Sequence, residues 1–177
     1  MRPSDNSGQN ARVHSEMKIE YTPIGLIRTP FKDVKSMPIQ PPAAKNVKGW
    51  VEVWPEYSAG LKDLEGFSHI ILLYHFHLSK GFSLQVKPFL DDCLRGVFAT
   101  RAPKRPNPIG LSVVRLLHIT GNIIWIEGVD IVDQTPLLDI KPFIPEFDAP
   151  RAGRIGWLTG KVNRVYKTHS DSRFFEY

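Results

Sequence analysis

The dense scatter of proline and glycine limits what this chain can fold into more than any other feature. Its 177 residues include 15 prolines and 13 glycines, and both residue types interrupt regular secondary structure. The apolar segments left between them are short, which suits strands better than long helices. We therefore expect the chain to be built mainly of β-structure.

Seven segments have the composition of strands, with apolar and β-branched residues between turn-forming ones. They are Lys18–Arg28, Trp50–Trp54, Ser68–Leu78, Gly96–Arg101, Ser112–His118, Ile123–Val132 and Leu137–Phe143. Both alternating faces of Ser68–Leu78 are largely apolar, so we expect this strand to be covered on both sides. Gly121 and Asn122 predict a type II′ turn in a tight hairpin. Pro55–Leu64 predicts one short helix with proline at its start.

These elements predict an all-β domain. The sequence lacks the strand–helix alternation that a doubly wound sheet requires, and closing the strands into an antiparallel barrel removes their exposed edges. We expect this barrel over residues 18–148, interrupted by a long proline-rich loop at Thr29–Asn46. Residues 1–17 predict a disordered N-terminal tail. Residues 149–177 are expected to form a basic extension that is docked against the domain at first and loose at its end.

The charge and the cysteine content bear on the partner and the cellular location of the protein. The net charge of +5 and the pI of about 9.4 favour a polyanionic partner, although an ordinary basic surface explains them equally well. Cys93 is the only cysteine, which excludes an intrachain disulfide and favours a reducing, cytoplasmic location. No apolar run reaches the roughly 18 residues of a membrane-spanning helix, so we expect no membrane association.

The stretch from Arg101 to Ser112 holds the densest group of candidate functional residues. Three prolines stiffen it, and Arg101, Lys104 and Arg105 supply positive charge without a neighbouring acid. A rigid basic loop of this kind can bind a carboxylate or a phosphate with little ordering cost. A proline-rich surface loop with solvated arginines is the alternative interpretation.

Acidic and histidine residues form two further patterns. Asp133 lies in an apolar strand–turn–strand segment, where it suits either a turn or the binding of ribose hydroxyls; on residue type alone the turn is favoured. His69, His75 and His77 share one strand face. No further ligand cluster accompanies them, so we expect no metal site. The glycine-rich phosphate loops and the G-x-S-x-G elbow are also absent from the sequence.

Five motifs in order resemble the TsaA-like (TrmO) family. They are Ile24–Lys32, Leu64–His69, Gly96–Arg101, Arg105–Ser112 and Leu138–Pro142. The resemblance extends from about Ile19 to Phe147. It implies a single-sheeted antiparallel β-barrel that binds S-adenosylmethionine (SAM) and works as a homodimer with sites near the subunit interface. It also implies N6-methylation of threonylcarbamoyl-adenosine next to the anticodon of tRNA, without a metal.

The resemblance also implies a set of site residues. The expected contacts to SAM are Pro41, Pro42, Ala43, His77, Leu78, Arg101, Leu111, Asp133, Gln134, Thr135 and Pro136. We assign Arg101 to the methionine carboxylate or a substrate phosphate, and Asp133 to ribose or amine groups. The candidate tRNA contacts are Lys104, Arg105, Asn107 and Lys141, and Asp139 is the candidate general base.

Two departures from the family pattern stand out. The family usually has glycine where this chain has Gln134, and a positive φ at that position would strain glutamine. Some members also carry a further C-terminal domain thought to help with tRNA, whereas this chain ends about thirty residues after the expected barrel. Two alternatives stay open: a non-catalytic RNA-binding barrel with Trp50 and Trp54 stacking on bases, and a methyltransferase acting on another RNA or a small molecule.

Overall fold

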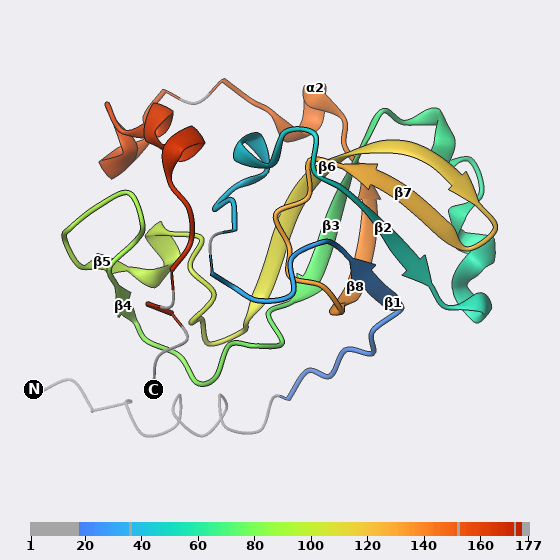
Figure 1. The fold of residues 1–177 in the computed structure, drawn as a ribbon, viewed down its shortest axis with the longest axis horizontal. Coiled ribbons are helices and arrows are strands. Elements are labelled where there is room, and N and C mark those ends of the chain that lie inside the picture. The colour runs from blue at the N-terminus through green and yellow to red at the C-terminus, as the bar shows by residue number, and fades with distance from the viewer. Residues whose placement is uncertain (1–17, 36, 152, 172, 175–177) are drawn as a thin grey trace, which may run out of the picture.

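The chain forms a closed six-stranded antiparallel barrel in a computed structural model, which describes residues 18–35, 37–151, 153–171, 173 and 174 (Figure 1). The all-β expectation is therefore confirmed. Around the barrel the strand order is β1-β2-β7-β6-β3-β8, and β8 pairs with β1 to close it. The strands are β1 (Gly25–Arg28), β2 (Lys48–Val53), β3 (His69–His75), β6 (Ile109–Thr120), β7 (Ile123–Glu127) and β8 (Thr135–Pro142).

The core fills the barrel interior, because alternate side chains of each strand point inward. On β3 the inward residues Ile70, Leu72 and Tyr74 are buried, while the outward ones are half-buried rather than fully covered. The strand expected to be covered on both sides is thus closed to solvent on its inner face only. The hairpin between β6 and β7 turns at Gly121, whose φ of 61° is what the first central residue of a type II′ turn requires.

Two expected elements differ in kind from the structure, and two expected strands are much shorter: Lys18–Arg28 is extended only at Gly25–Arg28 and Ile123–Val132 only at Ile123–Glu127. Gly96–Arg101 is not a barrel strand: only Arg95–Gly96 is extended (β5), it pairs with β4 (Gln85–Val86), and a 3₁₀ turn (η4) follows at Val97–Ala99. Pro55–Leu64 is not one helix but a 3₁₀ helix at Pro55–Leu61 (η2), with a second short one at Leu64–Gly66 (η3). In both segments the local composition was compatible with the expected element, and the chain follows tighter turns instead.

The remaining short helices lie outside the barrel wall. They are η1 (Pro41–Ala44) in the long loop, α2 (Pro145–Asp148) after β8, η5 (Gly156–Leu158) and η6 (Val162–Lys167). Figure 1 shows residues 156–171, which we call the C-terminal segment, beside the β4–β5 hairpin and away from the β6–β7 turn. Among the described residues, no helix has the length and apolar character that crossing a bilayer requires. The expected N-terminal tail, residues 1–17, lies outside the described residues.

A second apolar cluster joins these peripheral parts. Val86, Val97, Ala102 and Phe174 are buried together, and Phe89 packs against them with its ring edge-on to that of Phe174. The loop before η1 is held to the same region, since the Ser170 hydroxyl accepts a hydrogen bond from the Met37 amide. The residues after the barrel are therefore packed against two loops of the domain.

Candidate functional site

A cavity of about 340 Å³ opens where β3 ends and β6 begins. Its walls come mainly from five segments: the end of β3 with residues 76–79, the start of β6, the 130–135 segment, the loop around residues 34–40 and the loop around residues 100–105. Phe89, Ser170 and Phe174 also line it. Five of the expected SAM contacts line it, namely His77, Leu78, Arg101, Leu111 and Thr135. Residues 77 and 135 are far apart in sequence and meet because β3 and β8 are neighbours in the barrel.

A chain of hydrogen bonds joins three polar residues at the inner end of this cavity. The Tyr74 and Ser112 hydroxyls are 3.1 Å apart, and the Ser112 hydroxyl donates to the Asp130 carboxylate over 2.8 Å. Burial raises the pKa of Asp130 to about 6, although Ser112 and the charge of Arg101 oppose the rise. Burial and the charge of Asp130 also raise the pKa of Tyr74 well above its usual range. The result is a carboxylate whose charge is sensitive to the contents of the cavity.

His77 and Thr135 form the opposite polar part of the cavity lining. The Thr135 hydroxyl donates to the Val132 carbonyl over 2.7 Å and lies 3.3 Å from Nδ1 of His77. Burial, followed by the nearby His75, lowers the pKa of His77. At neutral pH the imidazole of His77 is therefore uncharged and presents an apolar ring with one donor and one acceptor. The described residues contain no group of three or more His, Cys, Asp or Glu side chains placed to hold a metal ion.

Arg101 stands between this cavity and a larger one. Its side chain is exposed, and Nη1 donates to Oε1 of Gln40 over 3.0 Å. Both residues line the smaller cavity and also a second cavity of about 970 Å³. This hydrogen bond is to an amide rather than to an acid, so the guanidinium keeps its charge available for an anionic ligand.

Asp133 is buried away from the cavity lining. Its carboxylate accepts hydrogen bonds from the Thr29 amide (3.0 Å) and from Nζ of Lys32 (2.6 Å). Burial alone would raise its pKa, but these hydrogen bonds and the nearby cations outweigh burial and lower it. The carboxylate thus fixes the start of the long loop to the turn before β8. The next residue, Gln134, is exposed and has a φ of 63°, so the position does have the left-handed conformation that favours glycine.

The other expected SAM contacts lie either at the larger cavity or at neither cavity. Pro41 and Pro42 line the larger cavity through η1. Ala43 and Pro136 are half-buried and belong to neither set of lining residues. The smaller cavity therefore gathers about half of the expected set, and Arg101 connects it to the proline pair.

The candidate tRNA contacts and the candidate base fall into different environments. Nη1 of Arg105 donates to the carbonyls of Val97, Thr100 and Ala102, so this guanidinium holds the loop together. Lys104 is half-buried and Asn107 is exposed.

Lys141 and Asp139 form an ion pair with each other on β8 at 2.8 Å, and neither lines either cavity. The carboxylate that faces the smaller cavity is Asp130 instead.

Tyr74, Ser112 and Asp130 were not among the expected site residues. One sequence pattern could have identified two of them. Tyr74 and Ser112 lie in phase with the inward residues of their strands, where a polar group needs a partner. Asp130 precedes the Asp133 turn within the same acidic segment, but nothing local distinguishes a cavity acid from a turn acid.

Comparisons with known proteins identify the family of this chain. The family model described as "tRNA-methyltransferase O N-terminal domain" matches residues 26–149. A probable S-adenosyl-L-methionine-binding protein of Pyrococcus abyssi is 58% identical over 159 residues, which are 90% of this chain and 86% of that protein. A human tRNA (adenine(37)-N6)-methyltransferase is 36% identical over 73% of this chain and 31% of its own length.

The crystal structure of TrmO from Pseudomonas aeruginosa is similar with a TM-score of 0.68 and 39% identity. The alignment covers 80% of this chain and 63% of that one. The chain therefore spans less than two thirds of this structural relative and most of the Pyrococcus protein.

Proposed function

Because the chain belongs to the tRNA-methyltransferase O N-terminal domain family, we propose that it transfers the methyl group of SAM to N6 of an adenine in tRNA. The observation that carries this proposal is the smaller cavity, which collects His77, Leu78, Arg101, Leu111 and Thr135 from separate parts of the chain. A methyl transfer depends chiefly on holding two reactants in line, and a cavity of this kind supplies that positioning.

The residues of the smaller cavity fit SAM in size and chemistry. A volume of about 340 Å³ lies in the range of small-molecule sites. Arg101 offers a charged donor for the methionine carboxylate, Phe76 and Leu111 offer apolar surface, and Thr135 offers a hydroxyl. When bound, SAM supplies an electrophilic methyl group on a positively charged sulfur.

Asp130 is the residue that we assign to the proton of the acceptor nitrogen, in place of Asp139. It faces the cavity, and Ser112 orients its carboxylate at 2.8 Å. An acceptor N6 that carries a carbonyl substituent is a weak nucleophile, so methyl transfer to it depends more strongly on removal of its proton. Asp139 is paired with Lys141 outside the cavity, which leaves it badly placed for this role.

The pH dependence of the rate tests this assignment. The ionised carboxylate is the active form and its pKa in the unliganded protein is about 6, so kcat/KM should rise through pH 6 and level off about one pH unit above it. Asp130→Asn should lower kcat by about 10²–10⁴-fold, the usual contribution of a general base, and remove this dependence. If Asp130→Asn instead weakens SAM binding and leaves kcat unchanged, the residue binds the amino group of SAM.

We propose threonylcarbamoyl-adenosine next to the anticodon as the acceptor, and a cytoplasmic homodimer as the working form. Apolar residues around the cavity mouth support the dimer: Leu78, Ile109 and Leu111 line the cavity yet remain 43%, 39% and 48% exposed. A second subunit placed there would cover them and would exclude water from the site.

Two measurements test the proposed function. Calorimetry on the purified chain should detect SAM binding without added metal, and chelator should not abolish it. Nucleoside mass spectrometry should then find the N6-methylated nucleoside in tRNA incubated with the protein and SAM. Absence of SAM binding at millimolar concentration would refute the methyltransferase. RNA binding without methylation would favour the non-catalytic barrel.

A further inference from the structure

The larger cavity lies between the outer face of the barrel and the C-terminal segment. Its floor is formed by outward side chains of β6, including Val113 and Arg115, with His69 of β3 and Glu127 of β7 beside Arg115 in the same row of the sheet. One wall is η1 with Lys45, and another is the loop around Phe98. The C-terminal segment supplies the remaining wall through Trp157, Leu158, Val162 and Val165.

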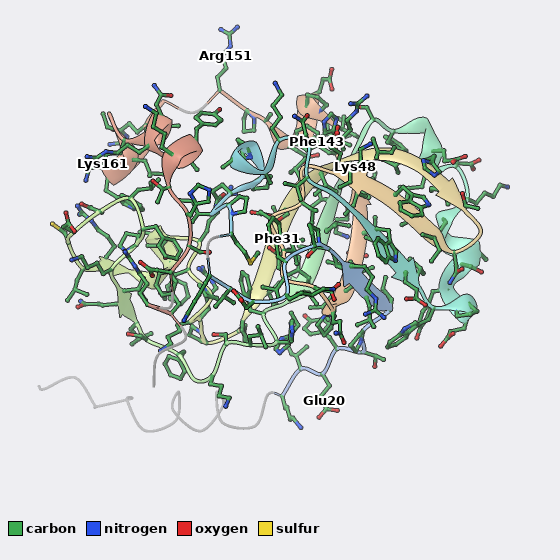
Figure 2. All side chains as sticks on the ribbon, in the orientation of Figure 1. Glu20, Phe31, Lys48, Phe143, Arg151 and Lys161 are labelled. Atoms are coloured by element: carbon green, nitrogen blue, oxygen red, sulfur yellow. The ribbon has the colours of Figure 1, made fainter. Side chains whose placement is uncertain are left out.

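Specific contacts fix the C-terminal segment in this position. Nε1 of Trp157 donates to the carbonyl of Ala99 over 2.8 Å. Nζ of Lys161 donates to Asp91 over 2.7 Å, and Arg95 donates to the second oxygen of the same carboxylate. These two cations hold the pKa of Asp91 well below its usual range. Figure 2 shows Lys161 on this segment at the left edge of the molecule and Arg151 projecting outward at the top of the view.

The charge around the larger cavity suits a polyanion. Residues 149–177 contain six of the chain's lysines and arginines and two of its acids, although the residues of this range that line the cavity are uncharged. The lining itself carries Lys45, Arg101 and Arg115. Among the described lining residues Glu127 is the one acid, and it is paired with Arg115 at 3.2 Å.

Aromatic rings accompany these cations. Phe89, Phe98 and Trp157 line the cavity; Phe98 is 75% exposed, and the other two are half-buried. Exposed rings beside cations are the usual combination in sites for unstacked bases, because the rings stack on bases while the cations contact phosphates. The volume of about 970 Å³ is also far larger than the neighbouring cavity.

We propose that the larger cavity holds the acceptor nucleotide of the RNA strand, with the C-terminal segment as one of its walls. The two cavities share Gln40 and Arg101 along their border. The N6 of a base in the larger cavity would therefore point across this border, toward Asp130 and the cofactor in the smaller one. The inference rests on the proposed function. It gives this chain an RNA site that the residues after the barrel help to form.

Substitutions at Trp157 test this site. Trp157→Ala removes the ring and should raise Kd and KM for tRNA by roughly 5- to 150-fold, the range for loss of one base–aromatic stack. Its SAM affinity should stay within about twofold of the wild type. Trp157→Phe keeps a stacking ring but loses the hydrogen bond to Ala99, so it should retain near-wild-type tRNA binding and separate stacking from folding.

Arg115→Gln provides an independent test with little risk to folding, because the Arg115 side chain is 62% exposed. It should reduce the slope of log Kd for tRNA against log salt by about one if Arg115 contacts a phosphate. Lys62→Ala is the matched control, since Lys62 is exposed and lies outside both cavity linings. That variant should behave like the wild type.

The aromatic row on the barrel's outer face gives the competing outcome. The Trp125 ring lies 5.7 Å from that of Trp50 and is stacked on His118. If Trp125→Ala weakens tRNA binding while Trp157→Ala and Arg115→Gln do not, RNA binds that face and the inference is wrong. A wild-type chain that binds SAM but neither binds nor methylates tRNA would instead refute the proposed function, and the two failures are therefore distinguishable.

Discussion

Gly110→Ala should have a large effect for the addition of a single methyl group. Gly110 lies opposite Tyr74 in the β3–β6 ladder. A Cβ at position 110 would lie 2.1 Å from Cε2 and 2.4 Å from Cζ of the Tyr74 ring. Carbon atoms in contact are normally about 3.5–4.0 Å apart, so the ring would have to move by about 1.5 Å. Tyr74 is buried and its hydroxyl is held by Ser112, so the ring has little freedom to move.

Overpacking of this kind lowers the free energy of unfolding by about 1–3 kcal/mol, and loss of the Tyr74–Ser112 hydrogen bond adds about 1 kcal/mol. For a chain of this size we expect Tm to fall by about 4–16 °C. SAM affinity should fall as well, because Tyr74 lines the smaller cavity. Scanning calorimetry and SAM titration measure the two effects.

Gly66→Ala is the matched control, because a Cβ there would meet nothing within 4 Å. In a Tyr74→Leu background the cost of Gly110→Ala should largely disappear, since the clashing ring atoms are gone. A Gly110→Ala protein that melts within 1 °C of the wild type and binds SAM equally well would show that the close approach is not a constraint.

Three further changes follow from the described contacts. Gln134→Gly should raise the free energy of unfolding by about 0.5–1 kcal/mol, because relief of left-handed strain exceeds the entropy cost of glycine. Asp63→Gly is the comparison variant, since Asp63 has a φ of 65°. Equal Tm values for Gln134→Gly and the wild type would contradict the strain. Arg101→Ala should weaken SAM binding by about 10- to 150-fold and leave the apo Tm nearly unchanged; a large apo Tm loss with full SAM affinity would reassign it to structure. The pKa of the Asp133 carboxylate lies below the ordinary 3.8. The stability that this carboxylate provides is therefore present above pH 4 and is lost as the pH falls through the lowered pKa. Asp133→Asn lacks this ionisation, so its stability should fall less steeply below pH 4 in an acid titration.

The sequence predicted the barrel well because its main strands are marked by alternation. The inward phase of β3 and β6, and the Gly121 turn between β6 and β7, are properties of neighbouring residues. The failure at Gly96–Arg101 has the opposite origin. Its apolar residues suit a strand, but a strand needs a long partner, and the partner available is the two-residue β4. Local composition does not determine which distant segments pair.

The same distinction explains the candidate site. Arg101 and Leu111 fall in recognisable motifs, and the structure brings both to the smaller cavity. Asp130 was missed because its role arises where β3, β6 and the segment after β7 meet. Arg105 looked like a free cation in the sequence, yet three backbone carbonyls surround its guanidinium. Such contacts depend on how the loop folds back on itself, which residue type alone does not determine.

Closure of the barrel by β1 and β8 has a consequence for the newly made chain. Gly25 pairs with Val53 on one side and with Leu137 on the other. At a synthesis rate of about 5–20 residues per second, Leu137 is made about 4–17 s after Val53. During this interval the β1–β2 ribbon has an open edge that other nascent chains could join. Pro23 precedes β1 and Pro136 lies within β8. Pro23 has no N–H group to donate, so it makes the start of this open edge a poorer template for intermolecular pairing; Pro136 is made only with β8, the strand that closes the edge.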